Sequence, residues 1–143
     1  MRVFTFLVCF IVFNECAYSY CGDLPVISTT NSEGKKIGIV LSGNMIKNTP
    51  SWSPVEEEPP LSVQSASVKL LGWLKKNYPN YDGVKINKIA LNYYECSGYQ
   101  DKWYYLFEYS FIENGNELFG IANWVAALMD GSIVDVSTLG NSN

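Results

Sequence analysis

The sequence predicts an α+β domain in which one helix packs on a curved antiparallel sheet of about four strands, preceded by an irregular N-terminal segment. Three observations predict it. Apolar residues recur at helical spacing over residues 62–76, and the spacing then changes to the two-residue period of β-strands. Loops and Asn-Gly or Asp-Gly turns separate four β-rich runs, so the sheet is expected to be antiparallel.

The chain begins with the pattern of an export signal. Met1-Arg2 precedes an apolar run from Val3 to Phe13, and small residues stand at Ala17 and Ser19. The run is about half the roughly 20 residues that a membrane-spanning helix needs, although an uncleaved anchor is the alternative. We therefore predict that residues 1–19 are a signal peptide and that the product is periplasmic or extracellular, with no membrane span after cleavage.

Cleavage after Ser19 leaves 124 residues without histidine or arginine, because Arg2 is the only arginine of the chain. The remaining chain has nine lysines and thirteen carboxylates. This acidic balance argues against nucleic acid as a partner. Without histidine, the chain cannot form a serine or cysteine catalytic site that uses an imidazole as base, nor a zinc site with histidine ligands. No spacing singles out a carboxylate pair or a reactive lysine. We predict no catalytic residues, metal or cofactor, and the sequence does not specify an oligomeric state.

Two cysteines, Cys21 and Cys96, remain after Cys9 and Cys16 leave with the signal. Cysteines of exported chains usually pair, and no C-x-x-C redox motif is present. The prediction is a Cys21–Cys96 disulfide that ties the N-terminal segment to the sheet, worth about 4 kcal/mol on the chain-entropy model.

Residues 20–61 are expected to be irregular. Residues 28–34 form a polar loop, Ile37 to Leu41 is a short β-like run, and Gly43-Asn44 indicates a turn. Prolines then make residues 50–60 an extended strap that is incompatible with a helix.

The helix is expected to follow at once. Ser62 is a suitable N-cap, Lys75-Lys76 lie in the last turn, and Pro79 comes just beyond it. One stripe at helical spacing is predicted to be buried, and it consists of Val63, Ala66, Leu70, Trp73 and Leu74.

Two strands carry the centre of the predicted sheet. Val84 to Tyr94 is β-rich, and its alternation slips near Lys88, which indicates a bulge or strong twist. Trp103 to Ile112 alternates clearly and ends at an Asn114-Gly115 turn. Its helix-facing row is Trp103, Tyr105, Phe107, Tyr109 and Phe111, and its other face is Tyr104, Leu106, Glu108 and Ser110.

The run from Leu118 to Met129 suits either a strand or a helix, and we favour a strand because Gly120 weakens a helix. Residues 129–132 then form a hairpin turn into a last strand over 133–136. The domain is thus expected to cover residues 62–137, followed by a flexible tail of 138–143.

Several short motifs carry a resemblance to known proteins. They are Trp52-Ser53-Pro54, the Pro59-Pro60-Leu61-Ser62 helix start, Lys102-Trp103-Tyr104-Tyr105 and the run from Leu128 to Val134. Together they resemble small exported bacterial proteins of unknown function, and the order of elements is similar to cystatin-like and PepSY-like domains. That resemblance implies restraint of peptidases, but no cystatin-type Gln-x-Val-x-Gly loop is present, so no binding residues are carried over.

The candidate binding residues are Tyr94, Tyr99, Trp103, Tyr104 and Glu108. Dense tyrosine and tryptophan are typical of binding hot spots and sugar platforms, and the competing interpretation is that many of these rings fill the core. The leading hypothesis is a non-enzymatic module that recognises a protein or peptide through the open sheet face or the Cys96-to-Lys102 loop. The alternatives are a carbohydrate-binding or carboxylate-dependent hydrolase and a structural accessory domain of an envelope complex.

Overall fold

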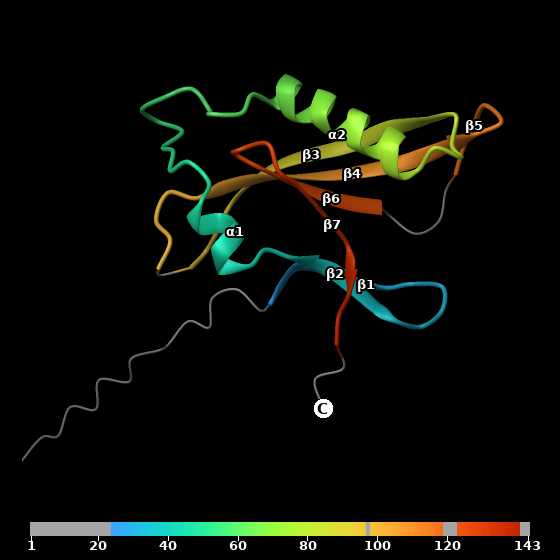
Figure 1. Ribbon diagram of the computed structural model, residues 1–143, viewed down its shortest axis with the longest axis horizontal. Coiled ribbons are helices and arrows are strands. Elements are labelled where there is room, and N and C mark those ends of the chain that lie inside the picture. Colours follow the sequence, from blue (N-terminus) through green and yellow to red (C-terminus); the bar gives the residue numbers. More distant parts are fainter. Residues whose placement is uncertain (1–23, 97, 119–122, 141–143) are drawn as a thin grey trace, which may run out of the picture.

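The computed structural model describes residues 24–96, 98–118 and 123–140, which form an α+β fold with two antiparallel sheets (Figure 1). The larger sheet has the order β3-β4-β6-β7, with β5 paired to β4. Its strands are β3 (Gly83–Tyr93), β4 (Trp103–Glu113), β5 (Asn116–Glu117), β6 (Asn123–Leu128) and β7 (Ile133–Asp135). The smaller sheet, ordered β1-β2-β8, consists of β1 (Pro25–Thr30), β2 (Lys36–Val40) and β8 (Ser137–Thr138).

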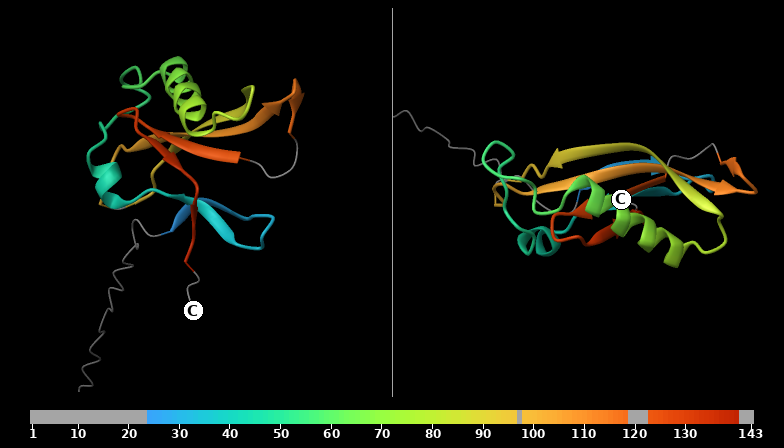
Figure 2. Two further views of the ribbon diagram at one scale, coloured as in Figure 1. Left: turned by 45° about the vertical axis from the view of Figure 1, so that its right-hand side comes forward. Right: turned by 90° about the horizontal axis from the view of Figure 1, so that it is seen from above.

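The two sheets and the long helix α2 (Val63–Asn77) form three layers (Figures 1 and 2). Helix α2 covers one face of the larger sheet, and the smaller sheet lies toward the other face with the short helix α1 (Gly43–Lys47). No helix within these described ranges is long and apolar enough to cross a membrane.

Helix α2 has the predicted start and end. The side chain of Ser62 accepts a hydrogen bond from the backbone N–H of Ser65 at 3.1 Å, which caps the first turn. Lys75 and Lys76 lie in the last turn, where they face the negative end of the helix dipole. Val63 departs from the predicted stripe because, as the first helical residue, it is 46% exposed. The fully buried residues of the helix are Ala66, Leu70 and Leu74.

The aromatic row of β4 packs on α2, as predicted. Phe107 is completely buried at its centre, and the Tyr105 hydroxyl donates to the Leu61 carbonyl at 2.9 Å, which joins the row to the end of the strap. Tyr81 stacks on Phe111 with ring centroids 3.9 Å apart. Helix and row therefore form one apolar core with Ala127 and Val125 of β6.

Three details of the larger sheet confirm local predictions. The β3–β4 register shifts between Ile86 and Lys88, where the alternation slips in the sequence. Asn114 and Gly115 have φ angles of 51° and 75°, the positive values that a tight hairpin turn requires. Residues 123–128 form a strand, whereas residues 119–122 of the ambiguous run lie outside the described residues.

The β-like run predicted at Ile37 to Leu41 is confirmed as β2, but the prediction that the rest of the N-terminal segment is irregular was wrong. The polar run at 28–34 contains the end of β1 and a turn in which the Asn31 side chain accepts from the N–H groups of Glu33 and Lys35, at 3.1 and 2.9 Å. The turn predicted at Gly43-Asn44 is instead the first turn of α1, because the Ser42 side chain caps it. In addition β8 includes Thr138, the first residue of the predicted tail.

The prediction that β4 has an open second face was also wrong. Ile39, Leu41 and Ile46 are at most 1% exposed and pack against that face. A two-stranded hairpin is marginal alone in water, so its apolar residues need another layer to cover them. Their partners in this second core are Tyr94, Cys96, Tyr104, Ala126 and Leu128.

Candidate binding site

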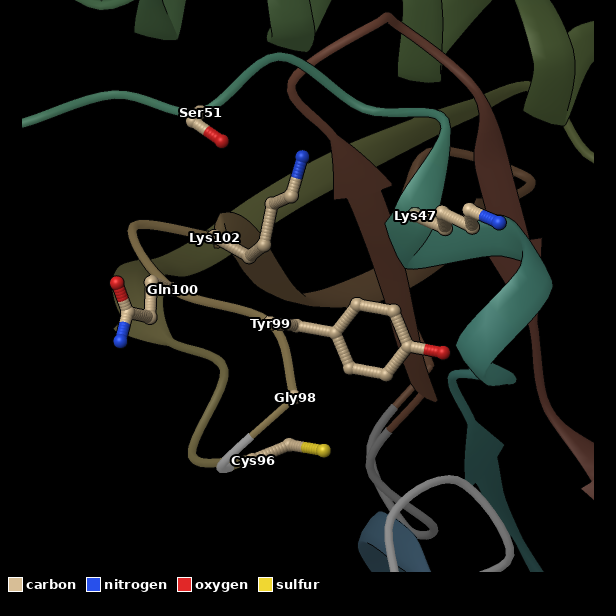
Figure 3. Close-up of a pocket in the computed structure, with 7 residues that line it drawn as sticks. All are labelled: Lys47, Ser51, Cys96, Gly98, Tyr99, Gln100 and Lys102. Carbon is tan, nitrogen blue, oxygen red and sulfur yellow. The ribbon is translucent and has the colours of Figure 1, made fainter.

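A hollow of about 620 Å³ lies where the loop between β3 and β4 meets the end of α1 and the start of the strap (Figure 3). This volume is in the range of small-molecule and peptide side-chain sites. We call it the loop hollow, and it is lined by Lys47, Ser51, Cys96, Gly98, Tyr99, Gln100 and Lys102. The lining comes from three segments that only the fold brings together.

The loop beside the hollow is fixed by backbone hydrogen bonds on both sides. The N–H of Trp52 in the strap donates to the Asp101 carbonyl at 2.8 Å, and the N–H of Tyr94 donates to the Lys102 carbonyl at 2.8 Å. Asp101 adopts a φ of 56°, a strained left-handed conformation that these contacts hold in place. Both ends of the loop are thus held in place, which lowers the entropic cost of binding there.

Tyr99 joins the loop to α1. Its ring meets that of Tyr94 edge to face with centroids 6.1 Å apart, and Figure 3 shows it extending from the loop toward α1. The hydroxyl lies so close to Gly43 that a Cβ atom added there would be 2.5 Å from the Tyr99 oxygen. Gly43 therefore leaves the space that Tyr99 occupies.

Lys102 is a buried cation in the wall of the hollow. It is only 8% exposed, and its ammonium donates to the backbone carbonyl of Thr49. Lys47 adds a second, exposed ammonium to the lining. The ion pairs among residues 24–96, 98–118 and 123–140 are Lys35–Glu33 and Lys85–Glu117, and neither includes a lysine of the hollow. The lining formed by the described residues therefore contains two lysine side chains and no acidic one, although the protein as a whole is acidic.

Tyr94 and Tyr104, predicted as binding residues, are structural. They are 7% and 6% exposed in the second core, and the Tyr94 hydroxyl donates to the Leu41 carbonyl at 3.0 Å. Burial, and to a smaller extent the charge of Glu95, raises the pKa of the Tyr104 hydroxyl. Neither ring is accessible to a partner in the way that the sequence suggested.

Trp103 and Glu108 lie apart from the loop hollow. Trp103 is half-buried between Trp52 and Tyr93, with ring centroids 5.7 and 5.1 Å away. Glu108 is half-buried rather than exposed, and its cross-strand neighbours are Lys88 on β3 and Trp124 on β6. Neither residue paired with Glu108 across the strands is therefore a carboxylate. Of the five predicted residues, Tyr99 alone lines the hollow.

Cys96 also lines the hollow, and its sulfur is not a free thiol. The other three cysteines of the chain lie outside the described residues. The Cys21–Cys96 pairing therefore stays a prediction.

Sequence reasoning named the loop but missed the cations that line the hollow. Lysine is rarely buried, so the residue type by itself argued against burial of Lys102. Lys47 was missed because α1 was not predicted. The one available signal was the position of Lys102, directly before the long aromatic strand, where its stem can be covered by rings.

A second cavity of about 340 Å³ lies between the end of α2 and the start of β3. Beside it the Tyr78 hydroxyl donates to the Asp135 carboxylate at 3.0 Å. Burial, followed by that hydrogen bond and the carboxylate charge, raises the pKa of Tyr78 to about 12. The bond holds the helix end to β7, which is a structural role.

Comparison with family models, curated proteins and solved structures found no match to this chain.

Proposed function

We propose that this protein is an exported, non-enzymatic binding module that recognises a protein or peptide through the loop hollow. The observation that carries the proposal is a preorganised polar hollow with a buried ammonium in its wall. Fixed loops that present a few polar groups around a concavity are typical of recognition sites. Restraint of a peptidase or neutralisation of a toxin would be specific forms of this function.

The second face of the larger sheet is buried, so the Cys96-to-Lys102 loop is favoured over that face as the binding surface. A sugar platform needs exposed aromatic faces, but the tyrosines on the second face of the larger sheet, Tyr94 and Tyr104, are in the core. The same burial removes that face as a docking surface for a protein. Tyr99 remains at the hollow, half-buried, where a ring edge is available to a ligand.

The export and non-enzymatic parts of the proposal rest on the sequence. The apolar run at 3–13 supports secretion, and the mature chain lacks the histidine and arginine that most catalytic sites use. We also propose that residues 62–137 are a cystatin-like or PepSY-like unit, supported by the packing of α2 across the larger sheet. The smaller sheet is an addition to that arrangement.

The function is tested by placing a photoreactive amino acid at Gln100, an exposed residue of the lining, in the exported protein within its native envelope. The matched control carries the same group at Val68, which is 65% exposed on α2. The proposal predicts a discrete protein or peptide adduct at Gln100 that the control does not form. Identical adducts at both positions, or retention of the protein on polysaccharide without any adduct, would contradict it.

The intact mass of the exported protein tests its processing. Cleavage after Ser19 removes residues 1–19, and a Cys21–Cys96 disulfide makes the product resistant to alkylation until it is reduced. A mass that retains residues 1–19 would refute the signal peptide, and two alkylated thiols before reduction would refute the disulfide.

A further inference from the structure

The buried ammonium of Lys102 has bonding capacity that the protein itself does not use. An ammonium carries three N–H donors, and the hydrogen bond to the Thr49 carbonyl accounts for one of them. Its side chain is 8% exposed, so water reaches it poorly. No carboxylate among the described residues forms an ion pair with it.

This arrangement is unfavourable for an isolated cation. A buried charge is normally paired, because a neutral acceptor compensates only part of the lost hydration. Thr49 is itself held, 3% exposed, with its hydroxyl donating to the Ile46 carbonyl at 2.8 Å. The ammonium is therefore held by the carbonyl of a buried residue, and this contact uses only one of its donors.

The surrounding groups suit an anion. Figure 3 shows the Lys102 side chain rising toward the segment that carries Ser51, while the Lys47 side chain, on α1, extends away from Lys102. The hydroxyl of Ser51 and the amide of Gln100 add neutral donors. The two lysines act as point charges, and an ammonium forms a short charge-assisted hydrogen bond with a single carboxylate oxygen.

We propose that the loop hollow binds a carboxylate group of its peptide or protein partner, with the Lys102 ammonium as the anchoring cation. The inference rests on the proposed function and names the chemistry of the group recognised. The carboxylate is supplied either by an acidic side chain or by the C-terminus of a polypeptide. It accepts hydrogen bonds from Lys102 and is attracted by Lys47 from the rim.

Four blocked dipeptides separate these two sources. The probes are acetyl-Ala-Glu-amide and acetyl-Ala-Ala with a free carboxylate, and their uncharged counterparts are acetyl-Ala-Gln-amide and acetyl-Ala-Ala-amide. Each is titrated into the mature, oxidised protein while the backbone amide signals of Ser51, Gly98 and Gln100 are followed by NMR. We expect at least one carboxylate probe to shift these signals with an affinity at least about tenfold above that of its counterpart, as for a charge-assisted hydrogen bond.

The lysine variants provide the matched controls. Lys102→Met keeps most of the stem and removes the charge, and it should weaken the carboxylate probe at least about tenfold. Lys47→Met, at an exposed position, should weaken it by about two- to fivefold, and Lys88→Met on β3 should leave it unchanged. Unchanged amide signals away from the hollow establish that each variant is folded.

Several results would overturn the inference. These are the absence of shifts at the hollow with both carboxylate probes, equal shifts with the uncharged probes, or full binding by a folded Lys102→Met variant. If the photocrosslinked adduct at Gln100 forms undiminished in the Lys102→Met variant, the proposal of a binding module stands and only the recognition of a carboxylate is refuted. Absence of the adduct in the unmodified protein would instead refute the proposed function.

Discussion

Replacing Leu41 by alanine tests whether the N-terminal segment is part of the fold, as the second core requires. Leu41 is 1% exposed and packs under the larger sheet, whereas Leu24, in the same segment, is 72% exposed. Leu41→Ala removes three carbons, which at about 0.8 kcal/mol each gives roughly 2.4 kcal/mol of lost transfer free energy. The cavity left behind brings the expected loss of unfolding free energy to about 2–5 kcal/mol.

The matched substitution Leu24→Ala should change stability by no more than about 0.5 kcal/mol, because the side chain is already in water. Urea unfolding of the mature, oxidised protein measures both. With a slope of about 1–3 kcal/mol per molar urea, Leu41→Ala should lower the midpoint by about 0.7–5 M without changing the slope. Equal, small effects of the two substitutions would refute the packing of β2 on the larger sheet.

The further predictions concern single residues. Gly43→Ala should displace the Tyr99 ring from α1, because the new Cβ would lie 2.5 Å from its hydroxyl oxygen, and loss of ring contacts between Tyr99 and α1 in NMR spectra measures this. Asp135→Asn should lower the pKa of Tyr78 from about 12 while leaving the part due to burial, and a carbon-detected NMR titration that shows no change would contradict the assigned cause. Because the raised pKa favours the protonated hydroxyl, the stability it contributes is complete below about pH 10 and is lost as pH rises through about 12. Gly131→Ala should cost about 1–2 kcal/mol in urea unfolding because its φ is +88°, and an unchanged midpoint would refute that strain.

The elements predicted correctly have signals that are local in the sequence. Helix α2 has its cap at Ser62 and its lysines in the last turn, so the signals that predict its bounds all lie within about 16 consecutive residues. Strand β4 alternates over eleven residues, and the bulge near Lys88 is visible as a slip in the alternation of β3. These signals do not depend on what the rest of the chain does.

The elements missed depend on contacts between distant segments. Strand β1 has six residues, too few for alternation to be distinctive, and a polar run obscures the turn that joins it to the predicted run at Ile37 to Leu41. Tyr104 was assigned to an open face because nothing near it in sequence covers it, although Ile39 and Leu41 do so in the fold. The burial of Lys102 also depends on a distant segment, because its ammonium donates to the carbonyl of Thr49, which lies 53 residues away in the sequence.

Zero-length carbodiimide coupling of the protein to the partner found at Gln100 tests the central claim most directly. This chemistry joins a lysine amine to a carboxylate only when the two are in contact, so the peptides that become linked identify which of the nine lysines faces the partner. The account predicts amide links through Lys47 or Lys102. Links spread over the exposed lysines of α2 and β3, with none at these two positions, would contradict it.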